Sequence, residues 1–263
     1  MKDILQRIAA TKRTEVEAAR LCTPLEMMRE SALRHTSPTR SLRRSIQSRD
    51  CGIIAEFKRR SPSRGEISPM AQVADIVADY TRNGAAGCSI LTDTPYFGGA
   101  VSDLQVARTV TDLPLLRKEF IIDEYQIYQT RTSGADAILL IASLLDATRV
   151  RRFTSVAHQL GMEVLLELHG EEELPMVFSD IDLVGVNNRN LRDFSVEFAP
   201  SLTLIEKLPA GCVKIAESGI RNSEDMLRLR EAGFDGFLIG EAFMGTASPG
   251  STLASYVNAR PCR

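Results

Sequence analysis

Eight short apolar runs follow one another along this chain, and their repetition limits its possible folds more than any other feature. The runs are rich in β-branched residues, and most are apolar in their middles with little alternation. Parallel strands that are covered on both faces have this character. In chain order the runs are GIIAEFK (52–58), GCSILTD (87–93), PLLRKEF (114–120), DAILLIA (136–142), EVLLEL (163–168), DLVGVNN (182–188), CVKIAES (212–218) and DGFLIGE (235–241).

Longer segments with helical character lie between these runs. Four of them end in a glycine shortly before a run, and glycine accepts the left-handed conformation that closes a helix. Asn222, followed by acidic residues in the first turn, is a clear helix start. The four segments are 70–84, 123–134, 146–161 and 222–233, and they end at Gly84, Gly134, Gly161 and Gly233.

The whole pattern favours a closed barrel over an open doubly wound sheet. The chain has 263 residues, close to the ~250 of one eight-stranded α/β barrel, although length alone also allows two domains. No GxGxxG motif follows the first run, which weakens the dinucleotide-binding alternative. We therefore predict an α/β fold, a (β/α)8 TIM barrel over 51–263. Residues 1–50, with Ile4, Leu5 and Ile8 on one helical face, are predicted to form an N-terminal helical extension packed on it.

Composition excludes several classes of function. The formal net charge is −2, so nothing global attracts nucleic acid or an anionic membrane, and the short basic run around Arg43 reads as a solvated helix face. No stretch has the character of a signal peptide or of a bilayer span. Cysteines are scattered without a CxxC pair, which favours a reducing compartment over disulfides or zinc. Cys51, Cys88 and Cys212 open predicted strands as small core residues. We expect a cytoplasmic protein without metal, nucleic-acid or membrane partners.

Polar side chains gather where the predicted strands end. A barrel interior is a packed core, so ionisable residues late in a strand need a reason, and residues two apart point the same way. A single lysine or glutamate at a strand end could equally well form a structural ion pair. Together they predict one mouth in which burial and neighbouring charge perturb pKa values, as acid–base catalysis requires. The residues are Glu56 and Lys58, Lys118 and Phe120, Glu167, Asn187 and Arg189, and Ser218.

A phosphate site is predicted beside them. Ser218 and Gly219 end the seventh run and Gly240 ends the eighth, the usual phosphate location in such barrels, where backbone N–H groups hold the anion. Ordinary turn glycines are the alternative. Ser251 or Thr252 is expected to help open the last helix, and SPSRG (61–65) has the look of a folded lid.

Aromatic residues and one histidine also fall near this mouth. Tyr96 and Phe97, with Phe120, are placed to wall an aromatic substrate, although such residues are more often core. His169 follows Glu167 by two residues and is the histidine able to point inward. His35 and His158 have no evident partner in the sequence, and nothing resembles a metal site.

Several segments, in order along the barrel, resemble the indole-3-glycerol phosphate synthase family, and the amino-terminal segment is similar to that family's helical extension. The combination is very specific, although AESGI or the strand-eight IG alone is not. The segments are IIAEFKRRSPSRG (53–65), LTDTPYFGG (91–99), LLRKEFIIDEYQIYQTRTSGADAILLI (115–141), LLEL (165–168), GVNNRNL (185–191), AESGI (216–220) and FLIGEAFM (237–244).

The resemblance implies a cofactor-free lyase of tryptophan biosynthesis. It would close 1-(2-carboxyphenylamino)-1-deoxyribulose 5-phosphate into indole-3-glycerol phosphate, releasing carbon dioxide and water. By this likeness Lys118 is the general acid at the ribulose carbonyl, and Glu167 is the acid–base group of the later proton loss and dehydration. Lys58 lies near the substrate carboxylate and is a second candidate acid. The other implied residues are Glu56, Asn187 and Ser218 (orienting), Arg189, Phe97 and Phe120 (substrate-contacting), and Ser61, Gly219, Leu238, Gly240 and Glu241 (around the phosphate).

The reaction and the shape of the substrate lead to two expectations. An acid at a carbonyl suits a lysine whose pKa is held near neutral by another cation. An apolar wall with a fixed phosphate anchor would bend the extended substrate back on itself. The departures from the family pattern are Glu119 for the more usual aspartate, Gly98 for a larger polar residue, and Pro175 interrupting the fifth helix.

Three alternatives stay open at this point. A sister enzyme such as phosphoribosylanthranilate isomerase would place cysteine or aspartate at the active end of the first strand, whereas Cys51 lies at the wrong end. A Schiff-base aldolase would use Lys58 or Lys118. A non-catalytic phosphosugar-binding regulator would not need the full set of charged residues. We expect a monomer, and a separate protein partner remains open.

Overall fold

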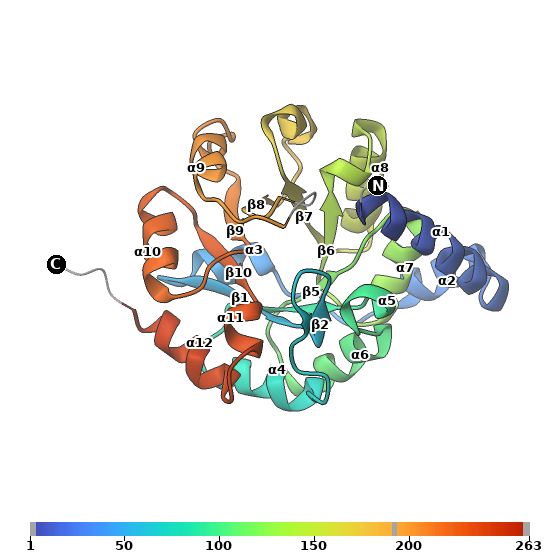
Figure 1. The fold of residues 1–263 in the computed structure, drawn as a ribbon. Coiled ribbons are helices and arrows are strands. Elements are labelled where there is room, and N and C mark those ends of the chain that lie inside the picture. The colour runs from blue at the N-terminus through green and yellow to red at the C-terminus, as the bar shows by residue number, and fades with distance from the viewer. Residues whose placement is uncertain (1–3, 191–193, 260–263) are drawn as a thin grey trace.

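Eight parallel strands close into a barrel in the computed structural model, which describes residues 4–190 and 194–259 (Figure 1). Neighbours in the barrel follow chain order, and the last strand pairs back with the first. Each predicted run contains one strand, one to three residues shorter except in the fifth run, so the (β/α)8 prediction is confirmed. The strands are β1 (Gly52–Phe57), β4 (Gly87–Leu91), β5 (Leu115–Lys118), β6 (Ala137–Ile141), β7 (Glu163–Leu168), β8 (Leu183–Asn187), β9 (Val213–Glu217) and β10 (Gly236–Ile239).

Helices surround the barrel as predicted. The four glycines expected to close helices all have positive φ, and the Asn222 side chain accepts a bond from Asp225 N at the start of its helix. Between β7 and β8 stands only a 3₁₀ segment, η2 (Glu171–Met176), because Pro175 cannot continue an α-helix. The outer helices are α4 (Val73–Arg82), α6 (Val101–Val110), α7 (Glu124–Thr132), α8 (Ala147–Gln159), α9 (Ala199–Ile205), α10 (Ser223–Glu231) and α12 (Pro249–Val257).

The strands bury both faces. Side chains such as Ile54, Leu116 and Leu165 form an inner apolar cluster, while their neighbours along each strand pack beneath the helices. This double coverage explains why the runs show so little alternation. Cys51 and Cys88 are buried as expected, Cys212 is only partly buried, and Cys262 lies outside the described residues. No helix within the described part of the chain is long and apolar enough to cross a membrane.

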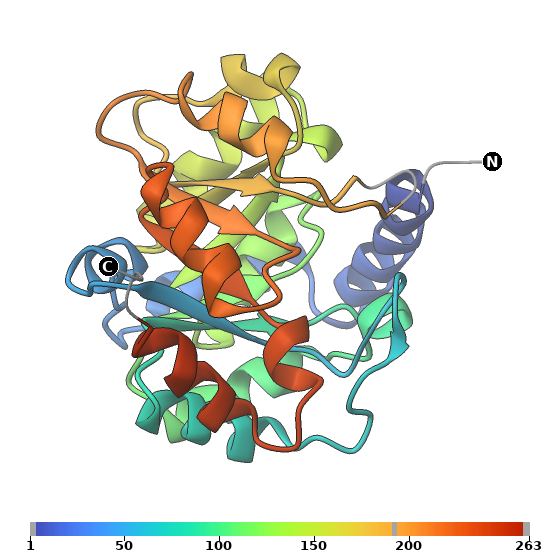
Figure 2. The same cartoon turned by 60° about the vertical axis from the view of Figure 1, so that its left-hand side comes forward.

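The three helices before β1 contact both ends of the barrel. The predicted amino-terminal helix is α1 (Ile4–Cys22), which lies beside the ends toward which the strands run (Figure 2). α2 (Leu25–Arg34) packs on α7, and α3 (Leu42–Gln47) inserts Leu42 and Ile46 into the inner cluster. Their path therefore runs from the mouth of the barrel to its amino-terminal end.

Asp136 connects the segment before β1 to the barrel, and removing its carboxylate should lower the stability of the fold. Its buried carboxylate accepts from Arg40 N (2.9 Å) and Leu115 N (2.8 Å) and pairs with Arg108 at 2.5 Å. We expect Asp136→Ala to lower the free energy of unfolding by about 3 kcal/mol, because it leaves a half-buried cation and two amides without their acceptor.

Asp112 supplies the control for this prediction. Its carboxylate is 97 % exposed and also pairs with Arg40 (2.6 Å), so Asp112→Ala should cost less than about 1 kcal/mol. Urea unfolding of both variants compares them directly. Equal losses would mean that Asp136 is no more important than a surface ion pair.

Candidate active site

A cavity of about 580 Å³ opens at the carboxyl ends of the strands. The structure brings all the residues expected from the sequence for catalysis and substrate binding to its lining. They are Glu56, Lys58, Ser61, Phe97, Lys118, Phe120, Glu167, Asn187, Arg189, Ser218, Gly219, Leu238, Gly240 and Glu241. Residues distant in sequence meet here because parallel strands deliver their last inward side chains to one end of the barrel.

Lys118, at the end of β5, occupies the centre of the charged group. Its Nζ lies 2.8 Å from Glu167 Oε2 on β7 and 2.5 Å from Glu217 Oε2 on β9. Burial would lower the pKa of Lys118, but the carboxylates of Glu167, Glu217 and Glu56 raise it above its ordinary value. The expectation of a near-neutral lysine beside another cation is therefore wrong, because Lys118 faces carboxylates. It carries its proton at neutral pH.

The second ammonium has its own partner. Lys58 Nζ lies 2.7 Å from Glu56 Oε1, two residues earlier on β1. Gly240 stands against this pair, since a Cβ there would collide with the Glu56 side chain. The absence of a side chain at Gly240 thus keeps the end of β10 open beside Glu56.

Glu167 is held by contacts on both carboxylate oxygens. Its Oε1 accepts from Asn187 Nδ2 (3.0 Å) and lies 3.1 Å from His169 Nε2. Burial would raise the pKa of Glu167, but Lys118 and His169 lower it well below its usual range. His169, the one histidine that the sequence placed near the mouth, therefore lies beside a site carboxylate.

The third carboxylate, Glu217, was missed in the sequence analysis. Ser218 was taken as the end of the seventh run, yet Val213 and Ile215 of β9 belong to the inner cluster. The same two-residue period that located Glu56 would have located Glu217. Gly185 on β8 leaves space for the Glu217 carboxylate, which a Cβ at that position would strike.

Directly after β9 the backbone turns through two left-handed residues. Ser218 has φ 66° and Gly219 has φ 76°, and a Cβ at Gly219 would collide with Val196. For serine this conformation costs roughly 1 kcal/mol. The turn directs this segment toward the cavity, where both residues line the wall.

The segment expected to form a lid is a two-stranded hairpin at the mouth. It comprises β2 (Arg60–Ser61) and β3 (Gly65–Glu66), and its tip residues line the cavity. Arg64 Nη1 lies 2.9 Å from Glu241 Oε1, and Arg189 Nη2 lies 3.4 Å from Glu241 Oε2. Glu241 is the first residue of the short helix α11 (Glu241–Met244), and its side chain contacts both arginines.

Two phenyl rings form one wall of the cavity. Phe97, from the short helix α5 (Thr94–Phe97), and Phe120 have ring centroids 5.9 Å apart and planes tilted by 37°. Ile4, Leu5 and Ile8 of α1 also line the cavity, although the sequence suggested only packing on the barrel. Tyr96 does not line it, because its hydroxyl lies against Thr11 Oγ1 of α1 (3.1 Å).

Two further expectations concern residues away from the cavity. Ser251 and Thr252 lie in the first turn of α12, as expected, where they bond to Ser248 and do not line the cavity. His158 has a partner that the sequence did not reveal, Asp182 Oδ2 at 2.8 Å.

Comparison with known families identifies the barrel. A family model described as indole-3-glycerol phosphate synthase matches residues 5–255. The chain belongs to this family. A protein named indole-3-glycerol phosphate synthase from Bacteroides thetaiotaomicron is 48% identical over 98% of this chain and 99% of its own length. One of the same name from Laribacter hongkongensis is 46% identical over 97% and 98%. The resemblance seen in the sequence is confirmed.

The similar solved structures support only the assignment of the fold. The 3-hexulose-6-phosphate synthase of Salmonella typhimurium superposes with a TM-score of 0.62 at 13% identity, over 78% of this chain and 96% of that one. Its likeness supports the barrel and says nothing of the reaction.

The carboxyl group of Glu217 makes the stability of this synthase family member depend on pH. Burial, together with repulsion from Glu167, raises its pKa from 4.5 to about 7 despite the attraction of Lys118. The folded protein thus binds this proton more tightly than the unfolded chain. Between about pH 4.5 and about pH 7 the contribution of Glu217 to stability therefore falls as the pH rises.

Glu217→Gln removes this titration and is the test. We expect the unfolding free energy of the variant, minus that of the wild type, to increase with pH across this window and then to level off. Urea unfolding at several pH values measures it. Glu171→Gln, an exposed change, should give a constant difference. A constant difference for Glu217→Gln as well would show that Glu217 ionises normally.

Proposed function

We propose that this chain acts as an indole-3-glycerol phosphate synthase. It closes 1-(2-carboxyphenylamino)-1-deoxyribulose 5-phosphate into indole-3-glycerol phosphate and releases carbon dioxide and water, a carbon–carbon lyase reaction of tryptophan biosynthesis. The observation that carries the proposal is the protonated Lys118 held between Glu167 and Glu217 in a cavity with an aromatic wall. Family membership supports it.

The two ends of the cavity suit the two ends of this substrate. Backbone N–H groups at Gly219, Gly240 and the start of α11, with Ser61 and Leu238 nearby, suit a phosphate. The Glu241 side chain is engaged by Arg64 and Arg189, so Glu241 would contribute its backbone amide. At the other end, Phe97 and Phe120 would hold the phenyl ring. Anchoring both ends bends the substrate so that its ring carbon faces the carbonyl.

Lys118 then acts as the acid of ring closure. As the ring carbon attacks the ribulose carbonyl carbon, the carbonyl oxygen takes a proton from Lys118 Nζ and becomes a hydroxyl. Loss of carbon dioxide from the ring carbon that made the attack restores aromaticity. Lys58 and Arg189 would seat that carboxylate before it leaves. The two carboxylates beside Lys118 keep its ammonium protonated until the carbonyl oxygen develops charge.

Glu167 acts in the dehydration that follows. It removes a proton from the CH2 group that joins the nitrogen to the new hydroxyl-bearing carbon, and the hydroxyl leaves as water with a proton from Lys58. Asn187, bonded to Glu167 Oε1 (3.0 Å), holds the carboxylate in orientation, and Glu56 does the same for Lys58 (2.7 Å). Ser218 would orient the substrate where β9 ends.

The direct test is to mix the pure protein with the carboxyphenylamino deoxyribulose phosphate and follow indole fluorescence. We expect indole-3-glycerol phosphate to form without added metal or cofactor. Ketose formation from phosphoribosyl anthranilate without indole absorbance would favour the isomerase. Substrate-dependent inactivation by borohydride would favour a Schiff-base aldolase, and binding without turnover would favour a regulator.

We also propose that residues 1–50 are an extension of one catalytic barrel, 51–263, and that the protein works as a monomer. Light scattering should then give a mass near 29.0 kDa at the concentrations of the assay. A dimer mass would contradict this.

A further inference from the structure

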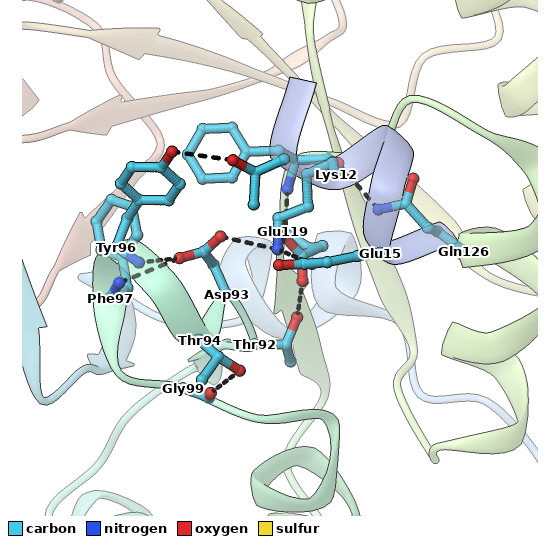
Figure 3. Close-up of polar contacts among 12 residues, drawn as sticks. Lys12, Glu15, Thr92, Asp93, Thr94, Tyr96, Phe97, Gly99, Glu119 and Gln126 are labelled. Carbon is cyan, nitrogen blue, oxygen red and sulfur yellow. Dashed lines mark hydrogen bonds and ion pairs between the residues drawn. The ribbon is translucent and has the colours of Figure 1, made fainter. Parts of the chain in front are cut away.

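A lysine of α1 is buried against two loops of the active site. Lys12 is 2 % exposed, and its Nζ lies 2.8 Å from Asp93 Oδ2 and 3.2 Å from Glu119 Oε1 (Figure 3). Glu15, one turn along the helix, is a third and half-exposed partner at 2.7 Å. Full burial of a lysine is rare, and here the cation is matched by carboxylates. Burial would lower the pKa of Lys12, but Glu119, Asp93 and Glu15 raise it above its ordinary value.

Asp93 transmits this contact to the first ring of the aromatic wall. Its Oδ1 accepts from the backbone N–H groups of Tyr96 (2.7 Å) and Phe97 (3.1 Å), and so caps α5 (Figure 3). Its Oδ2 is buried, and within residues 4–190 and 194–259 the Lys12 ammonium is its sole polar partner. The orientation of the helix that carries Phe97 thus depends on a carboxylate that Lys12 neutralises.

Glu119 transmits the contact to the second ring. Its Oε1 accepts from Phe120 N (2.9 Å), and its Oε2 accepts from the hydroxyl of Thr92 (2.6 Å). Glu119 also stands directly after Lys118 in the chain. Glu119 Oε1 therefore contacts both Lys12 and the backbone of Phe120, the residue that carries the second ring of the wall.

Four buried charges at this contact balance one another. Lys12 and Arg117 provide two cations, and Asp93 and Glu119 provide two carboxylates, all almost fully buried. Removing one member of such a set leaves an uncompensated buried charge, which the surrounding loops would move to solvate. The loops in contact with these charges are those after β4 and β5, which carry Phe97 and Phe120.

We infer that Lys12 is a positioning residue, which fixes the Phe97–Phe120 wall through Asp93 and Glu119 and so sets the affinity for the aromatic end of the substrate. The inference rests on the proposed function for the identity of that substrate. Lys12 is absent from the cavity lining, so any kinetic effect must be indirect, through these loops or through the part of α1 that lines the cavity. The amino-terminal helix thereby becomes part of the binding machinery.

Lys12→Met is the primary test, because methionine fills similar space without charge. A wall that contacts the ring equally in the ground and transition states contributes uniform binding. We therefore expect KM to rise by at least about tenfold while kcat falls less than about threefold. Arg13→Met, an exposed change at the next position of α1, is the matched control and should leave both constants unchanged. Circular dichroism and thermal unfolding confirm that each variant is folded at the assay temperature.

A double-mutant cycle separates positioning from a general loss of stability. If Lys12 acts through the wall, Lys12→Met in a Phe97→Ala/Phe120→Ala background, which lacks both rings, should raise KM by less than about twofold beyond that background alone. Additive effects, or an unchanged KM in Lys12→Met, would overturn the inference. If Lys12→Met does not fold, Lys12→Gln takes its place under the same criteria. Failure of the wild type to form indole would instead refute the proposed function, so the two failures are distinguishable.

Discussion

Lys118→Ala is expected to lower kcat by about a thousandfold while changing the substrate dissociation constant less than about tenfold. The variant loses the proton donor of ring closure, and the phosphate cradle and aromatic wall remain in place. It also leaves Glu167 and Glu217 facing each other without the cation that lay 2.8 Å and 2.5 Å from them. One of these carboxyl groups should then take up a proton at neutral pH.

The measurement pairs steady-state indole fluorescence with equilibrium binding of the substrate. Lys207→Ala, which removes a half-exposed lysine paired with Glu171, is the control and should have wild-type kinetics. If Lys118→Ala weakens binding as much as it slows turnover, then Lys118 is a binding residue and the acid must be sought elsewhere.

Glu167→Gln is expected to lower kcat by about a hundredfold or more with the fold intact. Glutamine has nearly the same shape and retains an oxygen for the Asn187 amide, but it cannot take the proton from the CH2 group beside the nitrogen. The loss should therefore fall on the rate. Glu171→Gln, on the exposed surface of η2, tests for an unspecific effect of removing a carboxylate. A Glu167→Gln enzyme running near the wild-type rate would remove the proposed acid–base role.

The two variants should also stop the reaction at different points. Lys118 acts as the new carbon–carbon bond forms, so single-turnover experiments with Lys118→Ala should return unchanged substrate. Glu167 acts afterwards, and Glu167→Gln should accumulate a decarboxylated intermediate that still carries the hydroxyl. Accumulation of the same species in both variants would contradict this division of labour.

Much of the site followed from the sequence because strand geometry is local. Residues two apart on a strand point the same way, and parallel strands all end at one edge. Glu56, Lys58, Lys118 and Glu167 could thus be assigned to one mouth without knowing any distance. Glu217 was within reach of the same rule and was missed only because Ser218 was read as the strand end. The glycines that end helices and the interruption at Pro175 could also be predicted, because both depend only on the local backbone.

The pairing of charges was decided only by the tertiary structure. Which carboxylate stands beside Lys118 depends on how the closed barrel brings together the ends of β5, β7 and β9, and no spacing along the chain encodes this. The sign of its pKa shift follows from those partners and from burial, so the expected near-neutral lysine was wrong. Lys12 reaches Asp93 and Glu119 across long stretches of sequence for the same reason. A periodic pattern fixes the face on which a side chain lies, whereas its electrostatic energy depends on distances across space.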